Sequence, residues 1–497
     1  MTSTVSFQKR IAKAFSDDSS IAFDLVSHLT YLSALSTARP SRNVIMERAA
    51  SLPFRTREYF QRVLALVKRL GFEYSRAFQL VAAVTQIEAM KGILSRFAGS
   101  IISGGNEALF LQQETVVAME RYVSDYDRAV EALKKWTDAF AALQVSATLI
   151  IVVGLISTLM YAINQVFIAA VGASMVGFVL LGVYIIGRSG PSEDKTYDTK
   201  GGPTIRRIAR ALFFTCAPAG LGLAFLMYRR GGLGAALLIL GLAVFPPGLC
   251  GYIDDRRVNK IDQDLPNLLR TLGALTSSLG STLTAALDKI DRKALGALEK
   301  PMRRLHGRLL FRLEDTVCWN KLFEETGSQL AYRTGRALVD AIRLGGPAER
   351  VGEICSGFAL QNVLLRSKRY TVAETFTYLS LPLHAAMVSL LLFVLQILVN
   401  FNNKITELLS GVSDGLSKAS SSLGMGGLPM FEVHDLHSSI LLTYALILAL
   451  TVANALGPHV AGGGHWLKSF FYLSITMVMS GICILVVPPA AAALFHI

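Results

Sequence analysis

Two adjacent aspartates, Asp254 and Asp255, are the first candidates for acid–base chemistry in this chain, because they directly follow a long apolar segment. A pair of carboxylates at membrane depth could activate water for hydrolysis. Here two arginines follow the pair immediately, and the apolar segments contain no second aspartate. The pattern therefore favours a solvated helix end over a membrane protease.

Three histidines are the other candidates for proton transfer or metal binding. His384 stands inside an apolar segment, where a neutral imidazole bonded to a neighbouring helix is favoured over a proton site. His459 and His465 flank a glycine-rich turn, but two histidines without a third ligand are a weak metal signal. The motifs GxxxxGK[ST], HExxH and GxSxG do not occur. We therefore expect no catalytic or nucleotide site, no metal, no cofactor and no enzymatic activity.

A row of basic residues at four-residue spacing points to binding instead. The row comprises Lys300, Arg304, Arg308 and Arg312, and leucines 305, 309 and 313 recur beside it. Since side chains four apart share a helix face, the spacing predicts a basic ridge next to an apolar one. A solvated or lipid-facing surface is an equally good interpretation. An acidic protein would also fit, whereas nucleic acid would not, since no aromatic side chains are interleaved for base stacking.

A looser basic cluster occurs near the start of the chain, around predicted turns at Pro40 and Pro53. Its members are Arg39, Arg42, Arg48, Arg55 and Arg57. We hypothesise that it lies beside the basic ridge if the two halves of the chain pack as neighbours.

The elements that must position these residues are mostly membrane helices. The 497 residues are 52% hydrophobic and only 17% charged, against about 25% charged in typical soluble domains. The deficit falls in seven apolar blocks, each close to the roughly 20 residues that a membrane-spanning helix needs. These blocks are residues 144–162, 165–187, 211–228, 232–253, 376–400, 438–458 and 469–493. We predict an all-α polytopic membrane protein with about seven transmembrane helices.

The charges predict a multi-pass protein of the cell membrane with its N-terminus in the cytoplasm. No signal peptide is recognised ahead of the first apolar block. If residues 1–143 lie inside, the outer segments hold four basic and four acidic residues: Arg229, Arg230, Lys404, Lys418, Glu407, Asp414, Glu432 and Asp435. The whole formal charge of +13 then faces the cytoplasm, as the positive-inside rule expects. The Arg229–Arg230 hairpin is basic and outside, so a re-entrant hairpin over 211–253 stays open.

An internal repeat sets the expected domain order. Leu32-Ser33-Ala34-Leu35 matches Leu272-Gly273-Ala274-Leu275 at an offset of 240, and Gly104-Gly105 matches Gly345-Gly346 at 241. Long helical patterns start near residues 106 and 347 and enter the first and fifth apolar blocks. We expect cytoplasmic helical bundles at 1–143 and 254–375, four membrane helices at 144–253 with a basic loop at 188–210, and three more at 376–497 with an outer loop at 401–436.

The helix predicted after Gly105 carries a seven-residue apolar repeat. One position holds Leu109, Val116, Val123, Val130 and Thr137, and the other holds Gln112, Met119, Tyr126, Leu133 and Phe140. This spacing is typical of a bundle or coiled-coil seam. The stripe is either the core of its own bundle, which is favoured, or a contact with a second subunit.

The order of these parts resembles a known family. The resemblance depends on three features of the sequence: Ile261-Asp262-Gln263-Asp264-Leu265-Pro266-Asn267-Leu268-Leu269-Arg270, then Leu279-Gly280-Ser281-Thr282-Leu283, and the Gly104-Gly105 and Gly345-Gly346 turns. Together with the repeat, they resemble the type II secretion system F-domain family, the membrane platform proteins of type IV filament machines. The size and extra helices are similar to the archaeal branch, which serves the archaellum and archaeal type IV pili.

The resemblance implies a platform that couples a hexameric secretion ATPase on the cytoplasmic face to pilin- or archaellin-like subunits. It also implies a homodimer or small homo-oligomer embedded in the lipid bilayer. Lys300, Arg304, Arg308 and Arg312, with Arg39, Arg42 and Arg48, are the expected ATPase contacts. A transporter or permease subunit is the alternative function, although the membrane blocks lack buried charge. The outer segment 401–436 is expected to be a loosely ordered loop. Its alternative is an amphipathic segment that rests on the outer membrane face or contacts the filament, as the spacing of leucines 408, 409, 416 and 423 and of Val412 allows.

Overall fold

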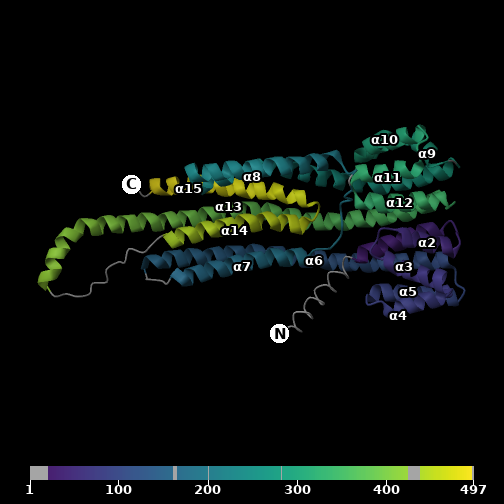
Figure 1. The fold of residues 1–497 in the computed structure, drawn as a ribbon, viewed down its shortest axis with the longest axis horizontal. Helices are drawn as coiled ribbons and strands as arrows, with labels where there is room; N and C mark the ends of the chain where they lie inside the picture. Colours follow the sequence, from purple (N-terminus) through teal and green to yellow (C-terminus); the bar gives the residue numbers. More distant parts are fainter. Residues whose placement is uncertain (1–20, 161–164, 200, 281, 424–436, 495–497) are drawn as a thin grey trace. The chain divides into compact units, whose positions relative to one another are not determined.

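The computed structural model describes residues 21–160, 165–199, 201–280, 282–423 and 437–494, and shows an all-α protein (Figure 1). Within these ranges there is no β-strand, and the single bridge pairs Thr196 with Ser328. The chain forms two compact units. Unit 1 contains the residues up to Glu131, Pro191–Arg207 and Ile253–Arg369, and unit 2 contains Ala132–Gly190, Ile208–Tyr252 and the residues from Tyr370 onward.

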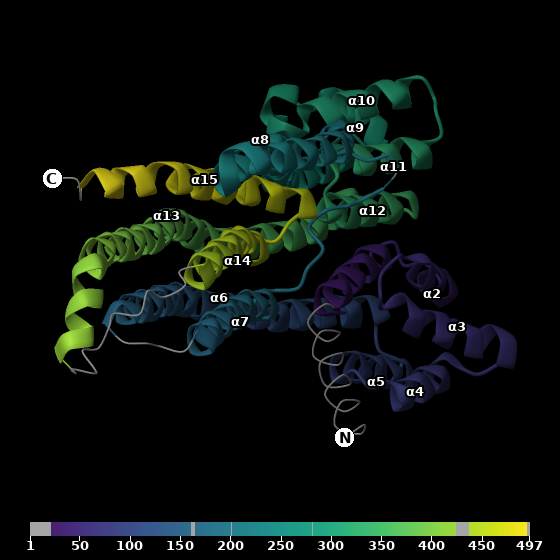
Figure 2. The same ribbon diagram turned by 60° about the vertical axis from the view of Figure 1, so that its left-hand side comes forward.

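Unit 1 is a bundle of short helices with three longer ones (Figure 2). Its first set is the helix Ile21–Ser36, α2 (Arg42–Ser51), α3 (Arg57–Leu70), α4 (Tyr74–Val84), α5 (Glu88–Ile102) and the beginning of α6 (Glu107–Met160). Its second set is the end of α8 (Thr204–Ser278), α9 (Leu283–Lys289), η1 (Arg292–Leu298), α10 (Glu299–Leu310), α11 (Asp315–Thr326), α12 (Gln329–Arg343) and the beginning of α13 (Ala348–Leu423).

The two sets of helices repeat one another in order and spacing. The starts of α4, α5 and α6 are separated by the same intervals as the starts of α11, α12 and α13. The glycines that precede the two long helices share a backbone conformation, with φ of 68° at Gly104 and 90° at Gly345. Only glycine adopts this left-handed region without a steric penalty. The sequence repeat therefore has a counterpart in the helices of unit 1.

A close crossing of α8 and α13 depends on two glycines. A Cβ atom on Gly273 would lie 2.6 Å from the carbonyl oxygen of Ala348 and 2.9 Å from the Cα of Gly352. Both obstacles are backbone atoms, which cannot rotate aside as a side chain can. The absence of side chains at this point brings the two helices together.

We expect Gly273→Ala to destabilise unit 1 by about 1 to 3 kcal/mol, because the added methyl group forces the helices apart. The matched control is Gly357→Ala on α13, where a Cβ meets nothing within 4 Å and alanine favours the helix by about 1 kcal/mol. Thermal unfolding in detergent should show shifts of opposite sign. A Gly273→Ala midpoint equal to or above that of the wild type would contradict the crossing.

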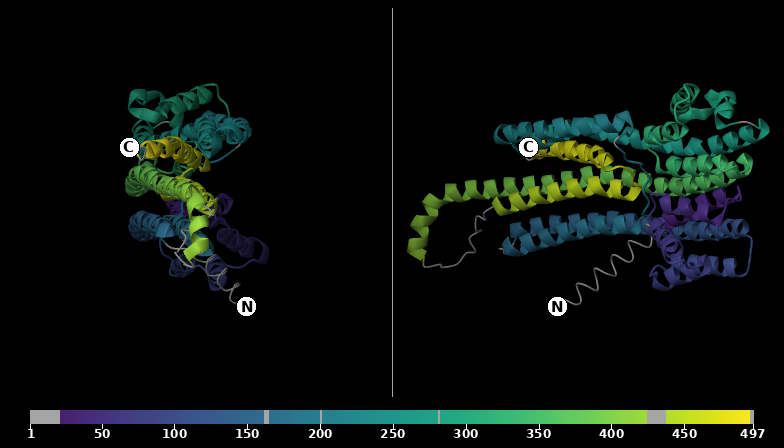
Figure 3. Two further views of the ribbon diagram at one scale, coloured as in Figure 1. Left: turned by 90° about the vertical axis from the view of Figure 1, so that its left-hand side faces the viewer. Right: turned by 45° about the vertical axis from the view of Figure 1, so that its right-hand side comes forward.

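Unit 2 consists of long apolar helices (Figure 3). It contains the remainder of α6, α7 (Gln165–Ser189), the middle of α8, the remainder of α13, α14 (His437–Gly462), η2 (Trp466–Lys468) and α15 (Ser469–Leu494). Helix α14 packs against both α7 and α15. Leu155, Val388, Leu391 and Leu450 lie in its buried core, so apolar side chains fill the interior of this unit.

Within the described residues, six helices are long and apolar enough to cross a membrane. One of them, α8, is broken at Gly232, which has φ 75° and ψ −172°. A Cβ on Gly220 would lie 2.4 Å from the Cβ of Ala243, although a straight helix would separate these residues by about 35 Å. Helix α8 therefore folds back into two antiparallel arms. These arms match the predicted blocks 211–228 and 232–253, so the count of about seven apolar segments agrees with the structure.

Three glycines at seven-residue spacing allow α8 to approach α15 closely. A Cβ would meet Ile484 at 2.9 Å from Gly234, Val478 at 2.9 Å from Gly241, and the backbone nitrogen of Phe471 at 2.4 Å from Gly248. Small residues at helix interfaces are typical of membrane proteins, where close backbone packing replaces the hydrophobic effect as the source of association.

The expectation of a loose loop at 401–436 is wrong for its first part. Helix α13 continues to Leu423, and its last turns bend away from the preceding segment (Figure 1). The serine and glycine content suggested a loop, but residues 401–423 also contain four leucines, two lysines and one alanine, which favour helix. Residues 424–436 lie outside the described residues.

Candidate functional site

The main polar site of unit 1 is organised around the segment Pro191–Arg207, which we call the connector. It follows α7 and includes the first turn of α8. The backbone N–H of Tyr197 donates to the carbonyl of Gly327 at 2.9 Å, and that of Gln329 donates to the carbonyl of Lys195 at 3.1 Å. These bonds attach the connector to the start of α12. Of the predicted basic loop 188–210, residues 191–207 belong to unit 1, and their described part is hydrogen-bonded to the start of α12.

Arg366 of α13 lies at the centre of this site between two carboxylates. Its guanidinium donates to Glu193 at 3.2 Å and to Asp262 at 2.7 Å. The side chains of Arg366, Glu193 and Asp262 are only 10%, 4% and 4% exposed, respectively. Ser328 also donates to Asp262. We call Arg366, Glu193 and Asp262 the ion triad. It links the connector, α8 and α13, and Ser328 adds the start of α12.

Burial and neighbouring charges have opposite effects on the pKa values of Asp262 and Arg366 in the ion triad. Burial raises the pKa of Asp262, and Arg366 opposes that rise. Burial alone would lower the pKa of Arg366, but the facing carboxylates of Glu193 and Asp262 raise it. The arginine therefore stays charged and offsets the cost of burying the two acids.

A second buried ion pair joins the two repeats. Arg333 of α12 donates to Asp24 of the helix Ile21–Ser36, and its guanidinium carbon lies 4.3 Å from the ring centre of Phe23 and 4.6 Å from that of Phe54. Burial lowers the pKa of Arg333, while the Asp24 carboxylate opposes the shift. Buried His28 contacts Thr56 at 2.8 Å in the same region. Burial lowers its pKa to about 3, and Arg333 adds to the shift, so His28 is neutral at pH 7.

Asp254 and Asp255 are buried, each 2% exposed, so the expectation of a solvated helix end is wrong. Asp254 pairs with Arg206 at 2.8 Å, and Asp255 pairs with Lys195 at 2.6 Å. Both basic partners come from the connector, far away in sequence. The adjacent arginines suggested local neutralisation, and the sequence contained no signal for the distant partners. The two aspartates therefore anchor the connector through ion pairs.

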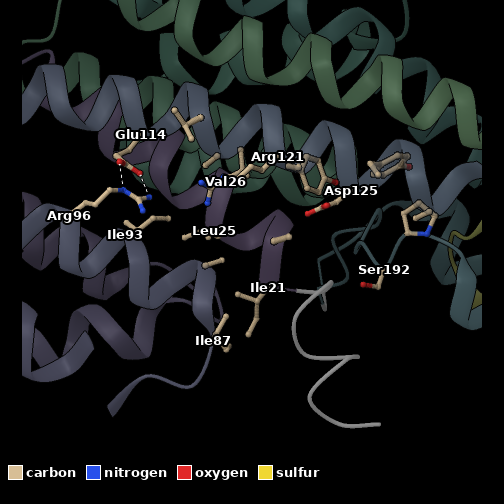
Figure 4. A pocket seen from close by; sticks show the side chains of 18 residues that line it. Ile21, Leu25, Val26, Ile87, Ile93, Arg96, Glu114, Arg121, Asp125 and Ser192 are labelled. Atoms are coloured by element: carbon tan, nitrogen blue, oxygen red, sulfur yellow. Dashed lines mark hydrogen bonds and ion pairs between the residues drawn. The ribbon is translucent and has the colours of Figure 1, made fainter. Parts of the chain in front are cut away.

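The connector also borders an apolar pocket of about 350 Å³ (Figure 4). Leu25, Ile87 and Ile93 line one part of it, and Pro191 and Ser192 of the connector line another. An ion pair between Arg96 and Glu114, at 2.7 Å, lies in its wall. Within the described residues, no group of three or more His, Cys, Asp or Glu could hold a metal. The observed arrangement can fix helices relative to the connector, and Arg96 and Glu114 in the pocket wall are paired with each other.

The structure places the predicted basic ridge differently from the sequence expectation. Lys300 and Arg304 are exposed on α10, but Arg308 is half-buried and pairs with Glu325. Arg304 also approaches Glu325, at 3.6 Å. Arg312 lies beyond the end of α10 in a left-handed conformation, with φ 55°. The prediction that four basic residues form one row on a single helix is therefore wrong.

The apolar ridge is corrected as well. Leu305 and Leu309 are buried, whereas Leu313 is 53% exposed. Because α10 ends at Leu310, the four-residue spacing no longer places Leu313 on the same face.

The early basic cluster contacts its own repeat. Arg42 pairs with Glu107 and lies 5.6 Å from the ring centre of Tyr74. Arg39 is exposed with a left-handed φ of 51°, and Arg48 is exposed in the last turn of α2. Arg42 and the ridge arginines Arg304 and Arg308 thus bind different carboxylates, each within its own set of helices.

The residues that carry the family resemblance have structural roles. Leu265 and Pro266 are buried in α8, and Arg270 is exposed. Asp264, in the same motif, accepts a bond of 2.7 Å from the backbone N–H of Ala297. Gly280 has φ 56° directly after the end of α8. The glycines of the Gly104-Gly105 and Gly345-Gly346 turns precede α6 and α13, and a Cβ on Gly346 would lie 2.8 Å from Oγ1 of Thr37.

The stripe on α6 is only partly core. Tyr126, Leu133 and Phe140 are buried, whereas Leu109 and Val116 are 54% and 57% exposed. The favoured interpretation, that the whole stripe fills its own bundle, is therefore wrong for the first half. A groove of about 880 Å³ runs beside this half, lined by α6 and α13.

A second polar site is buried in unit 2. Gln144 Nε2 donates to Asn454 Oδ1 at 2.5 Å, and Asn454 Nδ2 donates to His384 Nδ1 at 3.1 Å. Since Nδ1 accepts, the proton of neutral His384 lies on Nε2, which donates to Ser480 at 2.9 Å. Ser480 in turn contacts Thr451 at 2.7 Å. The predicted bond between His384 and a neighbouring helix is confirmed, and the chain links α6, α13, α14 and α15.

Sequence reasoning missed the connector acids and bases, Glu193, Lys195 and Arg206. Their only signal was the occurrence of acidic residues in an otherwise basic loop, at Glu193-Asp194 and Asp198. Such a signal does not identify partners, because the partners lie elsewhere in the chain.

The helices define an all-α, multi-pass membrane protein with a repeated helical bundle in unit 1. The chain is 21% identical over 439 residues to Flagella accessory protein J of Methanococcus voltae, covering 86% of this chain and 76% of that protein. It is also 20% identical over 328 residues to Flagella accessory protein J of Methanocaldococcus jannaschii, covering 64% of this chain and 58% of that protein. The chain thus spans less than two thirds of the length of the second relative. No family model and no solved structure matches the chain.

Proposed function

We propose that this protein is the membrane platform for assembly of an archaellum or related type IV pilus-like filament. In this role it couples a hexameric secretion ATPase to pilin- or archaellin-like subunits in the membrane. The observation that carries the proposal is the similarity to Flagella accessory protein J over 86% of the chain. In this proposal unit 1 and the N-terminus are cytoplasmic, as the charge distribution of the sequence favours.

The helices suggest how a platform of this kind could transmit movement. Helices α6 and α13 begin in unit 1 and continue into the apolar segments of unit 2. Arg366 ties α13 to the connector, and the connector leads directly into α8. A displacement of unit 1 would therefore act on three membrane helices through covalent continuity.

The exposed half of the α6 stripe supports a homodimer or small homo-oligomer. Leu109 and Val116 expose apolar surface. Their seven-residue spacing is that of residues at a coiled-coil interface between helices. A second copy of α6 would cover this surface.

Pull-down from native membranes in mild detergent tests the proposed function. We expect the wild type to retain a secretion ATPase, and the triple variant Lys300→Glu, Arg304→Glu, Arg312→Glu to lose most of it, since three basic groups would become acidic. Arg308 is left unchanged because its side chain is only 25% exposed and a glutamate there would lie directly against Glu325. Arg304 also lies near Glu325, at 3.6 Å, but its side chain is 60% exposed, so a glutamate there can turn into solvent.

The matched control is Lys260→Glu with Lys289→Glu, two exposed positions elsewhere in unit 1. Retention of the ATPase by the triple variant would move its binding site away from α10. Failure of the wild type to retain any ATPase, under conditions that preserve other membrane complexes, would contradict the proposed function. Flux of a substrate through reconstituted liposomes would instead support the transporter alternative.

A further inference from the structure

Two exposed turns of unit 1 have the same construction in both repeats. The turn between α3 and α4 reads Leu70-Gly71-Phe72-Glu73, and the turn between α10 and α11 reads Phe311-Arg312-Leu313-Glu314. We call residues 70–73 the first knuckle and 311–314 the second knuckle. Their separation in sequence equals that of the glycine turns before α6 and α13. In each knuckle two apolar residues flank one central residue, and a glutamate follows.

The backbone of the two knuckles is also alike. Gly71 has φ 68° and Arg312 has φ 55°, so both central residues are left-handed. Glu73 and Glu314 then occupy the position just before the next helix, α4 and α11, respectively, and neither side chain makes a capping hydrogen bond. Glycine adopts the left-handed region freely, but a residue with a side chain is sterically strained there. The second knuckle therefore has the same left-handed backbone as the first, with arginine in place of glycine.

The apolar side chains of the knuckles face water. Phe311 is 83% exposed, Leu70 66% and Leu313 53%. Phe72 is less exposed, at 39%, because the residue after a left-handed helix end packs back on the last turn. Large apolar residues grouped at a tip are typical of binding surfaces.

The helices that lead into the knuckles have matching charge. Helix α3 carries four basic residues and one acidic residue, and α10 carries the same numbers. Arg69 and Arg76 flank the first knuckle, and Arg303 and Arg304 lie on α10 about two helical turns before the second knuckle. All four are exposed, and Arg304 also approaches Glu325, at 3.6 Å. Each knuckle is therefore an apolar tip on a basic stem, which is complementary to an apolar socket with an acidic rim.

We propose that the two knuckles insert into two equivalent acidic-rimmed sockets on neighbouring subunits of one oligomeric protein. Two copies of the same tip require two copies of the same socket, which a ring of identical subunits provides. This inference rests on the proposed function, in which the cytoplasmic partner is a hexameric ATPase. A bilayer surface would accept a continuous amphipathic face, and it would give no reason to preserve a left-handed turn with one apolar residue on each side.

The test measures binding of the purified cognate ATPase to the full-length protein, both in detergent and in nanodiscs of anionic phospholipid. The variants are Leu70→Ser with Phe72→Ser, Phe311→Ser with Leu313→Ser, and all four together. The matched control is Val84→Ser, at an apolar position of unit 1 that is 67% exposed. All substituted residues are exposed, so the fold should persist, and unchanged thermal unfolding will verify this.

We expect each double variant to weaken binding about tenfold or more, as for anchors at an interface centre, and the fourfold variant to show none. The Val84→Ser control should bind like the wild type. Binding by both double variants equal to that of the control would overturn the proposal, as would an effect confined to one knuckle. An effect seen only in anionic nanodiscs would assign the knuckles to lipid and also overturn it. If the wild type itself does not bind the ATPase, the proposed function fails, and the knuckle proposal fails with it.

Discussion

Replacing Arg366 with methionine should lower the free energy of unfolding of unit 1 by about 3 to 5 kcal/mol, because removing one member of a buried ion group leaves the others uncompensated. The carboxylates of Glu193 and Asp262, each with 4% side-chain exposure, would then lose the guanidinium to which both are paired. Thermal unfolding in detergent, followed by the fluorescence of buried Trp319 in α11, measures the loss.

The control for this prediction lies close by on the same helix. Lys368 pairs with Asp127 at 2.8 Å, but the two side chains are 53% and 38% exposed, and such surface pairs contribute about 0 to 1 kcal/mol. Lys368→Met should therefore unfold close to the wild type. Equal unfolding midpoints for the Arg366→Met and Lys368→Met variants would show that the ion triad does not hold unit 1 together.

The defect of Arg366→Met should also depend on pH. Burial already raises the pKa of Asp262 against the opposing effect of Arg366, so removing the arginine raises it further. A carboxyl group with a raised pKa in the folded state binds its proton more tightly when folded, and stability then increases as pH falls. The difference between variant and wild type should be smaller at pH 5 than at pH 8.

Proline at position 364 should abolish filament assembly. Leu364 lies on α13 and is 49% exposed, so its side chain is not needed for packing. Proline removes a helical hydrogen bond and clashes with the preceding turn, at a cost of about 3 kcal/mol or more. The break would interrupt α13 before it reaches the apolar residues of unit 2. Electron microscopy of cells carrying Leu364→Pro should show no filaments.

Two further variants make this result specific. Leu364→Ala removes the same side chain but keeps the helix, and its filaments should be normal. Val130→Pro should break α6 in the same way as Leu364→Pro breaks α13. All three proteins should still retain the ATPase in pull-downs, since the breaks lie outside α10 and the knuckles. Wild-type filament numbers in Leu364→Pro cells would reject transmission through α13.

Local patterns predicted the helices of this protein well. Apolar blocks of membrane length, the repeat that relates the two sets of helices, and the glycine turns before the two long helices all depend on neighbouring residues. Helix ends were less predictable. The row from Lys300 to Arg312 continues in spacing beyond Leu310, but the backbone turns left-handed at Arg312, and an arginine carries no local signal for that turn.

Taken alone, the sequence determined the all-α class, the membrane segments, the basic charge and the repeat, because these follow from composition and short-range periodicity. Only the tertiary structure decided which charges are buried. Asp24 meets Arg333 across 309 residues, and Glu193 meets Arg366 across 173. Side chains so far apart in sequence show no regular spacing, because their pairing depends on how distant helices and the connector pack in unit 1. The exposure of the knuckles was likewise decided in three dimensions, since an apolar residue at a helix end looks the same in sequence whether it is covered or bare.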